Sequence, residues 1–68
     1  MQVRQRQDLL DDDLRIPVMN IGKGKPEYII LDYWTEVIRD DHDRGSDTIM
    51  WDGEEIELWS MDLEYKHD

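Results

Sequence analysis

The chain has 68 residues, of which 18 are acidic and 8 are Lys or Arg, so its formal net charge is -10 at pH 7. A domain of this length buries only about 60% of the surface that its unfolded chain exposes, so it needs a compact core or a partner. The absence of cysteine excludes disulfides, thiolate zinc sites and cysteine nucleophiles, and His42 and His67 do not by themselves make a structural zinc site.

The charge is distributed unevenly along the chain. Residues 27–68 hold fourteen acidic and three basic residues, whereas residues 1–26 hold four acidic and five basic ones. Such an acidic surface repels nucleic acid and anionic membranes and attracts basic protein surfaces. No apolar run has the length of a membrane span or a signal sequence, so we expect a cytoplasmic location, in a host cell if the protein is viral. Three tryptophans and three tyrosines favour a folded chain over a disordered one.

The first half of the chain predicts an arm, a strand and a loop. Residues 1–13 show little periodicity, and we expect them to form a mobile or short helical arm ahead of a single domain over residues 14–68. Residues 14–21 alternate in hydropathy, as a half-buried strand does, and Pro17 places that strand at a sheet edge. Two glycines and a proline within residues 22–26 predict a loop.

The strongest periodic signal lies in residues 27–39. Apolar residues recur there at helical intervals, with polar residues on the opposite stripe, which predicts an amphipathic helix. Pro26 suits the first turn of such a helix and Gly45 could terminate it. The same segment is rich in strand-forming residues that also alternate, so a long strand is the alternative. The apolar positions are Ile29, Ile30, Tyr33, Trp34, Val37 and Ile38.

Asp52-Gly53 carries the clearest local signal in the chain. It separates two runs of apolar and β-branched residues, 48–51 and 54–58, and an Asp-Gly pair in that position is typical of a two-residue β-hairpin turn. The sequence therefore predicts a hairpin near the C-terminus.

The second arm of the hairpin has two distinct faces. Ile56 and Leu58 share one face, and Glu55 and Glu57 share the other. After Leu58 the alternation shifts by one residue, which predicts a bulge near Trp59 or a short helix from there onward. Together these elements predict a small α+β domain, with one amphipathic helix packed on a short antiparallel sheet that contains the C-terminal hairpin; a mostly β chain is the alternative.

Several acidic residues around His42 have the chemistry of metal ligands. They are Asp40, Asp41, Asp43 and Asp47. An EF-hand register beginning at Asp43 puts Gly45 where a ligand is needed and Thr48 where glycine is needed, so we expect no dedicated metal site. No motif for a cofactor is present, and no nucleophile has an identifiable base, so we expect neither a cofactor nor enzymatic activity.

The acidic surface is the most informative feature for function. Carboxylates held at regular spacing on a helix stripe and on a strand face imitate a phosphate backbone. In size, acidity and lack of cysteine the chain resembles small viral proteins that imitate DNA, although this resemblance is one of composition and rests on no shared motif. We therefore expect an inhibitor or regulator that occupies the basic cleft of a nucleic-acid-binding protein, and that itself binds neither nucleic acid nor membranes.

The expected partner-binding residues comprise eight carboxylates and two indoles. An exposed aromatic residue with a charged rim is the usual anatomy of a binding hot spot. These residues are Asp32, Glu36, Asp40, Asp41, Asp43, Trp51, Glu54, Glu55, Glu57 and Trp59.

A second hypothesis uses the apolar residues instead of the charges. The aromatic and methionine side chains are numerous for one small core, so the protein could be a structural or accessory subunit that binds its partner through an apolar surface. Homodimerisation is another way to bury these aromatic and methionine side chains.

Overall fold

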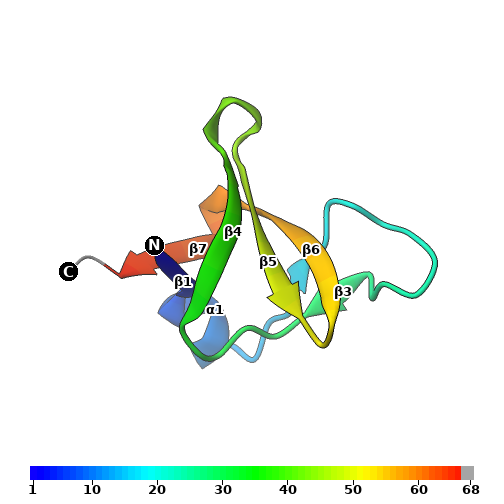
Figure 1. The fold of residues 1–68 in the computed structure, drawn as a ribbon. Helices are drawn as coiled ribbons and strands as arrows, with labels where there is room; N and C mark the ends of the chain where they lie inside the picture. The colour runs from blue at the N-terminus through cyan, green and yellow to red at the C-terminus, as the bar shows by residue number, and fades with distance from the viewer. Residues whose placement is uncertain (67–68) are drawn as a thin grey trace.

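The computed structural model describes residues 1–66, and His67 therefore lies outside the described residues. The fold is mostly β: an antiparallel five-stranded sheet has the order β6-β5-β4-β1-β7, and β2 pairs with β3 in a second, two-stranded sheet (Figure 1). The strands are β1 (Gln2–Gln5), β2 (Ile16–Pro17), β3 (Tyr28–Ile29), β4 (Thr35–Asp41), β5 (Ser46–Trp51), β6 (Glu54–Trp59) and β7 (Leu63–Lys66). The helical turns are α1 (Gln7–Asp11) and the 3-10 turns η1 (His42–Arg44) and η2 (Ser60–Asp62).

The predicted helix over residues 27–39 is wrong, and with it the helix-on-sheet fold. This segment contains β3, an irregular connection and the first part of β4. Its burial follows the period of a strand, because Ile29 and Leu31 are buried whereas Ile30 between them is 45% exposed. The apolar residues of this segment fit both the spacing of a helix and the alternation of a strand. Pairing with neighbouring strands selects the strand.

The N-terminal segment is part of the sheet. Residues predicted as an arm form β1, which lies between β4 and β7, and then the single turn of α1. Val3 and Gln5 of β1 are fully buried. The Gln5 side chain accepts a hydrogen bond from the Leu31 backbone N–H at 3.0 Å and donates one to the Leu14 carbonyl at 2.6 Å. Its polar groups therefore connect three separate segments of the chain in the interior.

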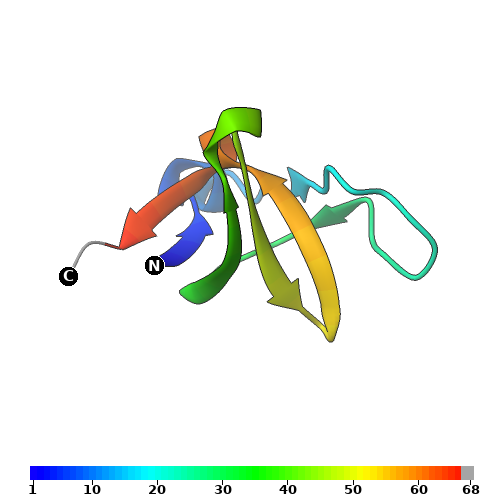
Figure 2. The same cartoon turned by 45° about the horizontal axis from the view of Figure 1, so that its top comes forward.

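Backbone contacts join the two sheets into a curved, nearly closed body. Val18 forms a bridge with Leu58 of β6, and the Met19 N–H donates to the Glu57 carbonyl at 2.8 Å. On the other side, the Gln5 N–H donates to the Leu31 carbonyl at 2.9 Å. The strands consequently curve around one core (Figure 2). The core residues are Val3, Ile16, Val18, Ile29, Leu31, Ile49, Ile56, Leu58 and Leu63.

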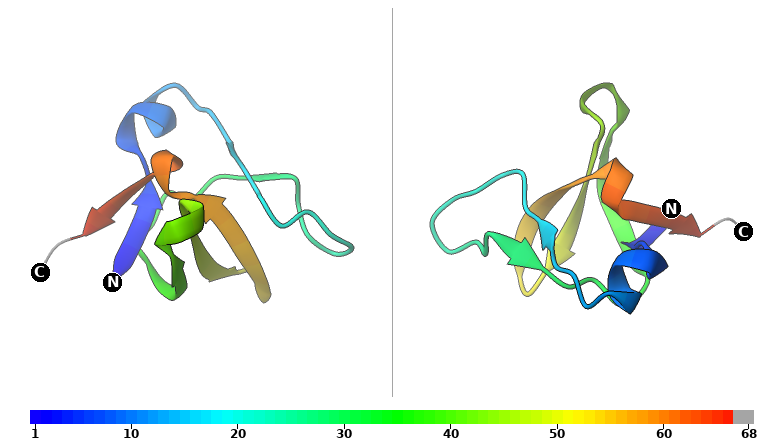
Figure 3. Two further views of the ribbon diagram at one scale, coloured as in Figure 1. Left: turned by 90° about the horizontal axis from the view of Figure 1, so that it is seen from above. Right: turned by 180° about the vertical axis from the view of Figure 1, so that it is seen from behind.

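The strand and loop predicted in the first half are present in shortened form. Of residues 14–21, only Ile16–Pro17 form a strand, although Ile16 and Val18 both point into the core. Residues 22–26 form the predicted loop, which extends away from the sheets in both views of Figure 3.

The hairpin at Asp52-Gly53 is confirmed. β5 and β6 pair without a register shift from Trp51 opposite Glu54 to Ser46 opposite Trp59. Asp52 has φ 50° and Gly53 φ 79°, the two positive values that a type I′ turn requires. The predicted bulge near Trp59 is absent from this pairing. The alternative, a short helix after Leu58, is present as η2, which follows Trp59 and shifts the alternation between β6 and β7.

Candidate functional site

The outer face of the β5–β6 hairpin brings several of the predicted residues together. Glu55, Glu57 and Trp59 alternate along β6 and therefore project from the same side of the strand. Met50 lies opposite Glu55 in the β5–β6 register. Trp59 is 40% exposed and Met50 is 45% exposed, so this face combines apolar surface with carboxylates.

Arginines from the neighbouring strand and turn balance part of the charge on this face. Arg39 Nη2 lies 3.7 Å from Glu55 Oε1, and Arg44 Nε lies 3.9 Å from Asp41 Oδ2. The Glu57 carboxylate accepts a hydrogen bond from Ser46 Oγ at 2.6 Å. Glu55 and Glu57 therefore each have a partner on this face, and they are not a uniform row of unpaired carboxylates. The exposed indole of Trp59 is the large aromatic side chain beside them.

The other predicted partner-binding residues lie elsewhere on the molecule. Glu36 on β4 pairs with the N-terminal ammonium at 2.9 Å, and Asp32 lies in the connection before β4. Asp43 is exposed in η1. Trp51 packs against the core, and Glu54 is its cross-strand neighbour. The structure thus gathers only Asp41, Glu55, Glu57 and Trp59 on one face.

A second group of functional side chains lies where β4 turns into β5. Asp40 and Asp47 are directly opposite each other in the β4–β5 register, and His42 follows two residues after Asp40 in η1. His42 Nε2 lies 2.7 Å from Asp40 Oδ1. One ligand atom from each of the three residues lies within 4.8 Å of the other two. Figure 1 shows this hairpin projecting from the sheet, with η1 at its tip.

Asp47 is the unusual member of this group, because its side chain is fully buried. Its Oδ2 atom accepts hydrogen bonds from Ser60 Oγ, at 3.1 Å, and from the Tyr65 hydroxyl. Its Oδ1 atom is buried and has no hydrogen-bond partner among the described residues. Burial of the Tyr65 hydroxyl and its hydrogen bond to Asp47 raise the pKa of Tyr65, so the phenol remains a donor at neutral pH.

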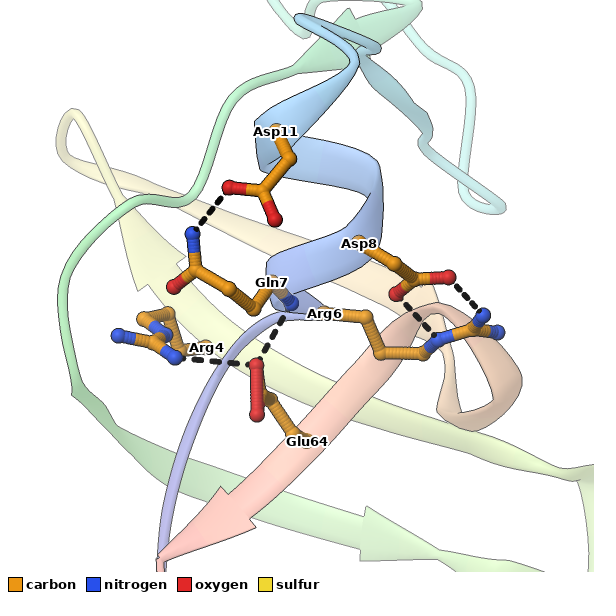
Figure 4. Close-up of polar contacts among 6 residues, drawn as sticks. All are labelled: Arg4, Arg6, Gln7, Asp8, Asp11 and Glu64. Atoms are coloured by element: carbon orange, nitrogen blue, oxygen red, sulfur yellow. Dashed lines mark hydrogen bonds and ion pairs between the residues drawn. The ribbon is translucent and has the colours of Figure 1, made fainter.

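The polar cluster around α1 shows the opposite arrangement (Figure 4). Arg4 Nη2 donates to Glu64 Oε1 at 3.0 Å, and the Gln7 N–H donates to the same oxygen at 2.7 Å. Arg6 Nε donates to Asp8 Oδ1 at 3.0 Å. Glu64 and Asp8 therefore each meet a cation, whereas Asp11 accepts a hydrogen bond from the Gln7 amide at 2.9 Å. The cluster connects α1 with the start of β7, and each of its carboxylates has a partner.

Sequence reasoning missed the roles of Asp47, Ser60 and Tyr65. The sequence places Asp47 among the acidic residues with the chemistry of metal ligands, but the EF-hand spacing fails there and nothing local shows that its carboxylate is buried. The useful signal was Gly45, whose φ of 71° allows the tight return that sets Asp47 opposite Asp40. No local pattern could show that Ser60 and Tyr65 come back to the same carboxylate.

Within residues 1–66 the longest helix has five residues, so none is long enough to cross a membrane. Comparisons with protein-family models, with curated proteins and with solved structures find no match to this chain, so the inferences on function rest on its own geometry and charge.

Proposed function

We propose that this protein is a small acidic binding module that inhibits or regulates a basic, nucleic-acid-binding protein. The observation that carries the proposal is the exposed Trp59 in line with Glu55 and Glu57 on the outer face of β6. The ten described exposed large hydrophobic residues include Met50 on the same face, which extends the apolar contact.

The two kinds of side chain have separate tasks in this proposal. Trp59 supplies a large apolar surface that loses water on binding, which is how tryptophan acts in interface hot spots. Glu55 and Glu57 form the charged rim, and the net charge of -10 steers the module toward a basic surface. The β5–β6 pairing holds these carboxylates on one strand about 6.8 Å apart. Glu55 lies near Arg39 and Glu57 accepts a hydrogen bond from Ser46, so a basic partner competes with these contacts.

A basic surface that normally contacts phosphates accepts such carboxylates in place of nucleic acid. Complex formation then releases counterions and weakens as salt rises. Asp40, Asp41 and Asp43 at the tip of the β4–β5 hairpin add to the long-range attraction, although Asp41 is already paired with Arg44. The proposal therefore assigns specificity to Trp59 and the rate of association mainly to the carboxylates.

The test is an affinity capture with the immobilised protein, washed in steps of rising salt and then challenged with DNA or RNA. We expect a nucleic-acid-binding protein that elutes at moderate salt and is displaced by the nucleic acid. The double substitution Glu55→Gln and Glu57→Gln should weaken its binding, and Trp59→Ala should weaken it further. The matched control is Asp12→Asn with Glu27→Gln, which removes the same charge from two exposed positions on other parts of the surface.

Two outcomes contradict the proposal. If the control pair and the Glu55 and Glu57 pair weaken binding equally, the interaction is unspecific charge attraction. A partner that is resistant to salt and indifferent to nucleic acid, but lost on Trp59→Ala, favours the accessory-subunit hypothesis. Sedimentation of the free protein tests the homodimer hypothesis, in which Met50 and Trp59 lie in an interface between two copies of the chain.

A further inference from the structure

The β4–β5 hairpin brings two carboxylates together at its tip without a matching Lys or Arg. Asp40 and Asp47 are a direct cross-strand pair, and like charges in that position repel each other. Among the described residues, His42 is the only basic side chain that pairs with Asp40, and none pairs with Asp47. The cluster therefore has a net negative charge held close together.

Asp47 provides an independent indication that a cation belongs here. A buried carboxylate is stable only when it is paired or fully hydrogen-bonded, and here only Oδ2 meets donors. Ser60 and Tyr65 are neutral donors, so they orient the carboxylate and leave its charge uncompensated. The Oδ1 atom, buried and without a hydrogen-bond partner, keeps its lone pairs for another ligand.

We propose that Asp40, His42 and Asp47 bind a divalent transition-metal ion of the Zn²⁺ or Mn²⁺ class. Metal–ligand bonds of about 2.0–2.2 Å place neighbouring ligand atoms roughly 3–3.5 Å apart, so a separation of 4.8 Å closes by roughly 1.3–1.8 Å. Asp40 and His42 have room for this movement because their side chains are 46% and 66% exposed. Asp47 stays in place, held by Ser60 and Tyr65.

The donor set selects the class of ion. One imidazole nitrogen with two carboxylate oxygens suits Zn²⁺, Mn²⁺ and similar ions, whereas Ca²⁺ and Mg²⁺ prefer sites made of oxygen alone. The two carboxylates neutralise the charge of the ion. Ser60 and Tyr65 act as outer-shell donors that orient a ligating carboxylate, which is a common arrangement around protein-bound metals.

The position of the cluster also gives the ion access and open coordination. Of the three ligands, only His42 lines the hollow that Gly45, Ser60 and Tyr65 form beside Met1. Asp40 and His42 are themselves exposed, so a hydrated ion can meet these two side chains from solvent. Three protein ligands leave at least one coordination position for water or for an atom of a partner molecule. Binding at the tip of the hairpin fixes η1 relative to β4 and β5, because His42 belongs to η1.

The test uses the untagged full chain and the metals alone, so it does not depend on the proposed protein partner. Calorimetry with Zn²⁺ and water-proton relaxation with Mn²⁺ should each report one ion per chain. His42→Gln and Asp47→Asn should each weaken binding by roughly tenfold or more. The matched control, Asp43→Asn, should change affinity less than about twofold. The ring nitrogens of His42 should shift on addition of Zn²⁺ in nitrogen-detected NMR spectra.

His42→Gln keeps the test decisive even if Asp47→Asn alters folding, because His42 is exposed and lies in no strand. Equal losses from Asp43→Asn and His42→Gln would show diffuse attraction by the acidic tip and overturn the site. Binding of Ca²⁺ as tight as that of Zn²⁺, or the absence of stoichiometric binding by either metal, would also overturn it.

Discussion

The two polar clusters of this molecule handle charge in opposite ways. Near α1, Glu64 and Asp8 each meet an arginine (Figure 4). At the tip of the β4–β5 hairpin, the fully buried Asp47 accepts hydrogen bonds from the hydroxyls of Ser60 and Tyr65 and has no other partner among residues 1–66. Both clusters join segments that are distant in the sequence, but in the first one Glu64 and Asp8 each pair with an arginine, whereas no Lys or Arg among the described residues pairs with Asp47.

The difference separates a structural role from a functional one. Carboxylates that each meet a cation stabilise the fold, whereas a buried carboxylate without one costs stability unless a proton or a cation joins it. Unbalanced charge of that kind is more common where a ligand binds. The four predictions that follow test this contrast.

The largest effect is expected from Arg4→Ala. The guanidinium of Arg4 pairs with Glu64, lies 4.7 Å from the centre of the Trp34 ring, and its side chain is only 23% exposed. Its removal leaves Glu64 without its cation and exposes Trp34, so we expect a loss of about 2 kcal/mol in the free energy of unfolding, measured with urea. Arg6→Ala is the control: that ion pair is exposed, and a loss as large as that of Arg4→Ala would contradict the assignment.

The opposite sign is expected for Asp47→Asn in the presence of a chelator. The amide oxygen still accepts hydrogen bonds from Ser60 and Tyr65, while the uncompensated charge disappears. We expect metal-free Asp47→Asn to be more stable than the parent by about 1–2 kcal/mol at pH 7.

Glu64→Gln makes the matching change in the cluster around α1. It should lower the free energy of unfolding, because Arg4 loses its anionic partner. Unchanged or lower stability of Asp47→Asn would contradict the contrast between the two clusters.

A smaller effect is expected at the backbone of the hairpin tip. Gly45 has φ 71°, a conformation that costs residues with a Cβ about 1 kcal/mol. Nothing lies within 4 Å of a Cβ added there, so Gly45→Ala should lower stability by about that amount through strain alone. Gly22→Ala is the control, because its φ is not in the left-handed region. Thermal unfolding of both variants gives the comparison.

The smallest effect is expected at Asp62, whose pKa is raised by burial more than it is lowered by the nearby cation Arg6. Burial raises the pKa of Asp62 above its ordinary value of 3.8, and Arg6 lowers it only in part. A raised pKa in the folded state means that the stabilising contribution exists below pH 3.8 and is lost as the pH rises through the folded pKa.

Asp62→Asn retains the neutral form at every pH. The variant should therefore be more stable than the parent at pH 7, by less than about 1 kcal/mol because water still reaches the group. The difference should vanish below pH 3.8 in acid titrations of unfolding, and a difference that grows toward acid would contradict the prediction.

Part of the fold was accessible from local chemistry. Asp52-Gly53 specified a turn with two positive φ values, and the alternation of Ile56 and Leu58 with Glu55 and Glu57 gave the faces of β6. The segment 27–39 misled the prediction because its apolar residues fit both periods. Leu31 is buried beside β1, and this contact with Gln5 lies outside any local pattern.

The candidate sites divide in the same way. Glu55 and Glu57 could be placed together because neighbours two residues apart on a strand share a side. Trp59 joins them because β6 runs without a bulge to Trp59, where a shift was predicted. The sequence by itself thus determined the acidic balance, the hairpin and the two faces of residues 55–58, since these depend on composition and on contacts between near neighbours. Only the tertiary structure decided that residues 2–5 enter the sheet and that Ser60 and Tyr65 enclose Asp47, because those contacts depend on which distant strands pair.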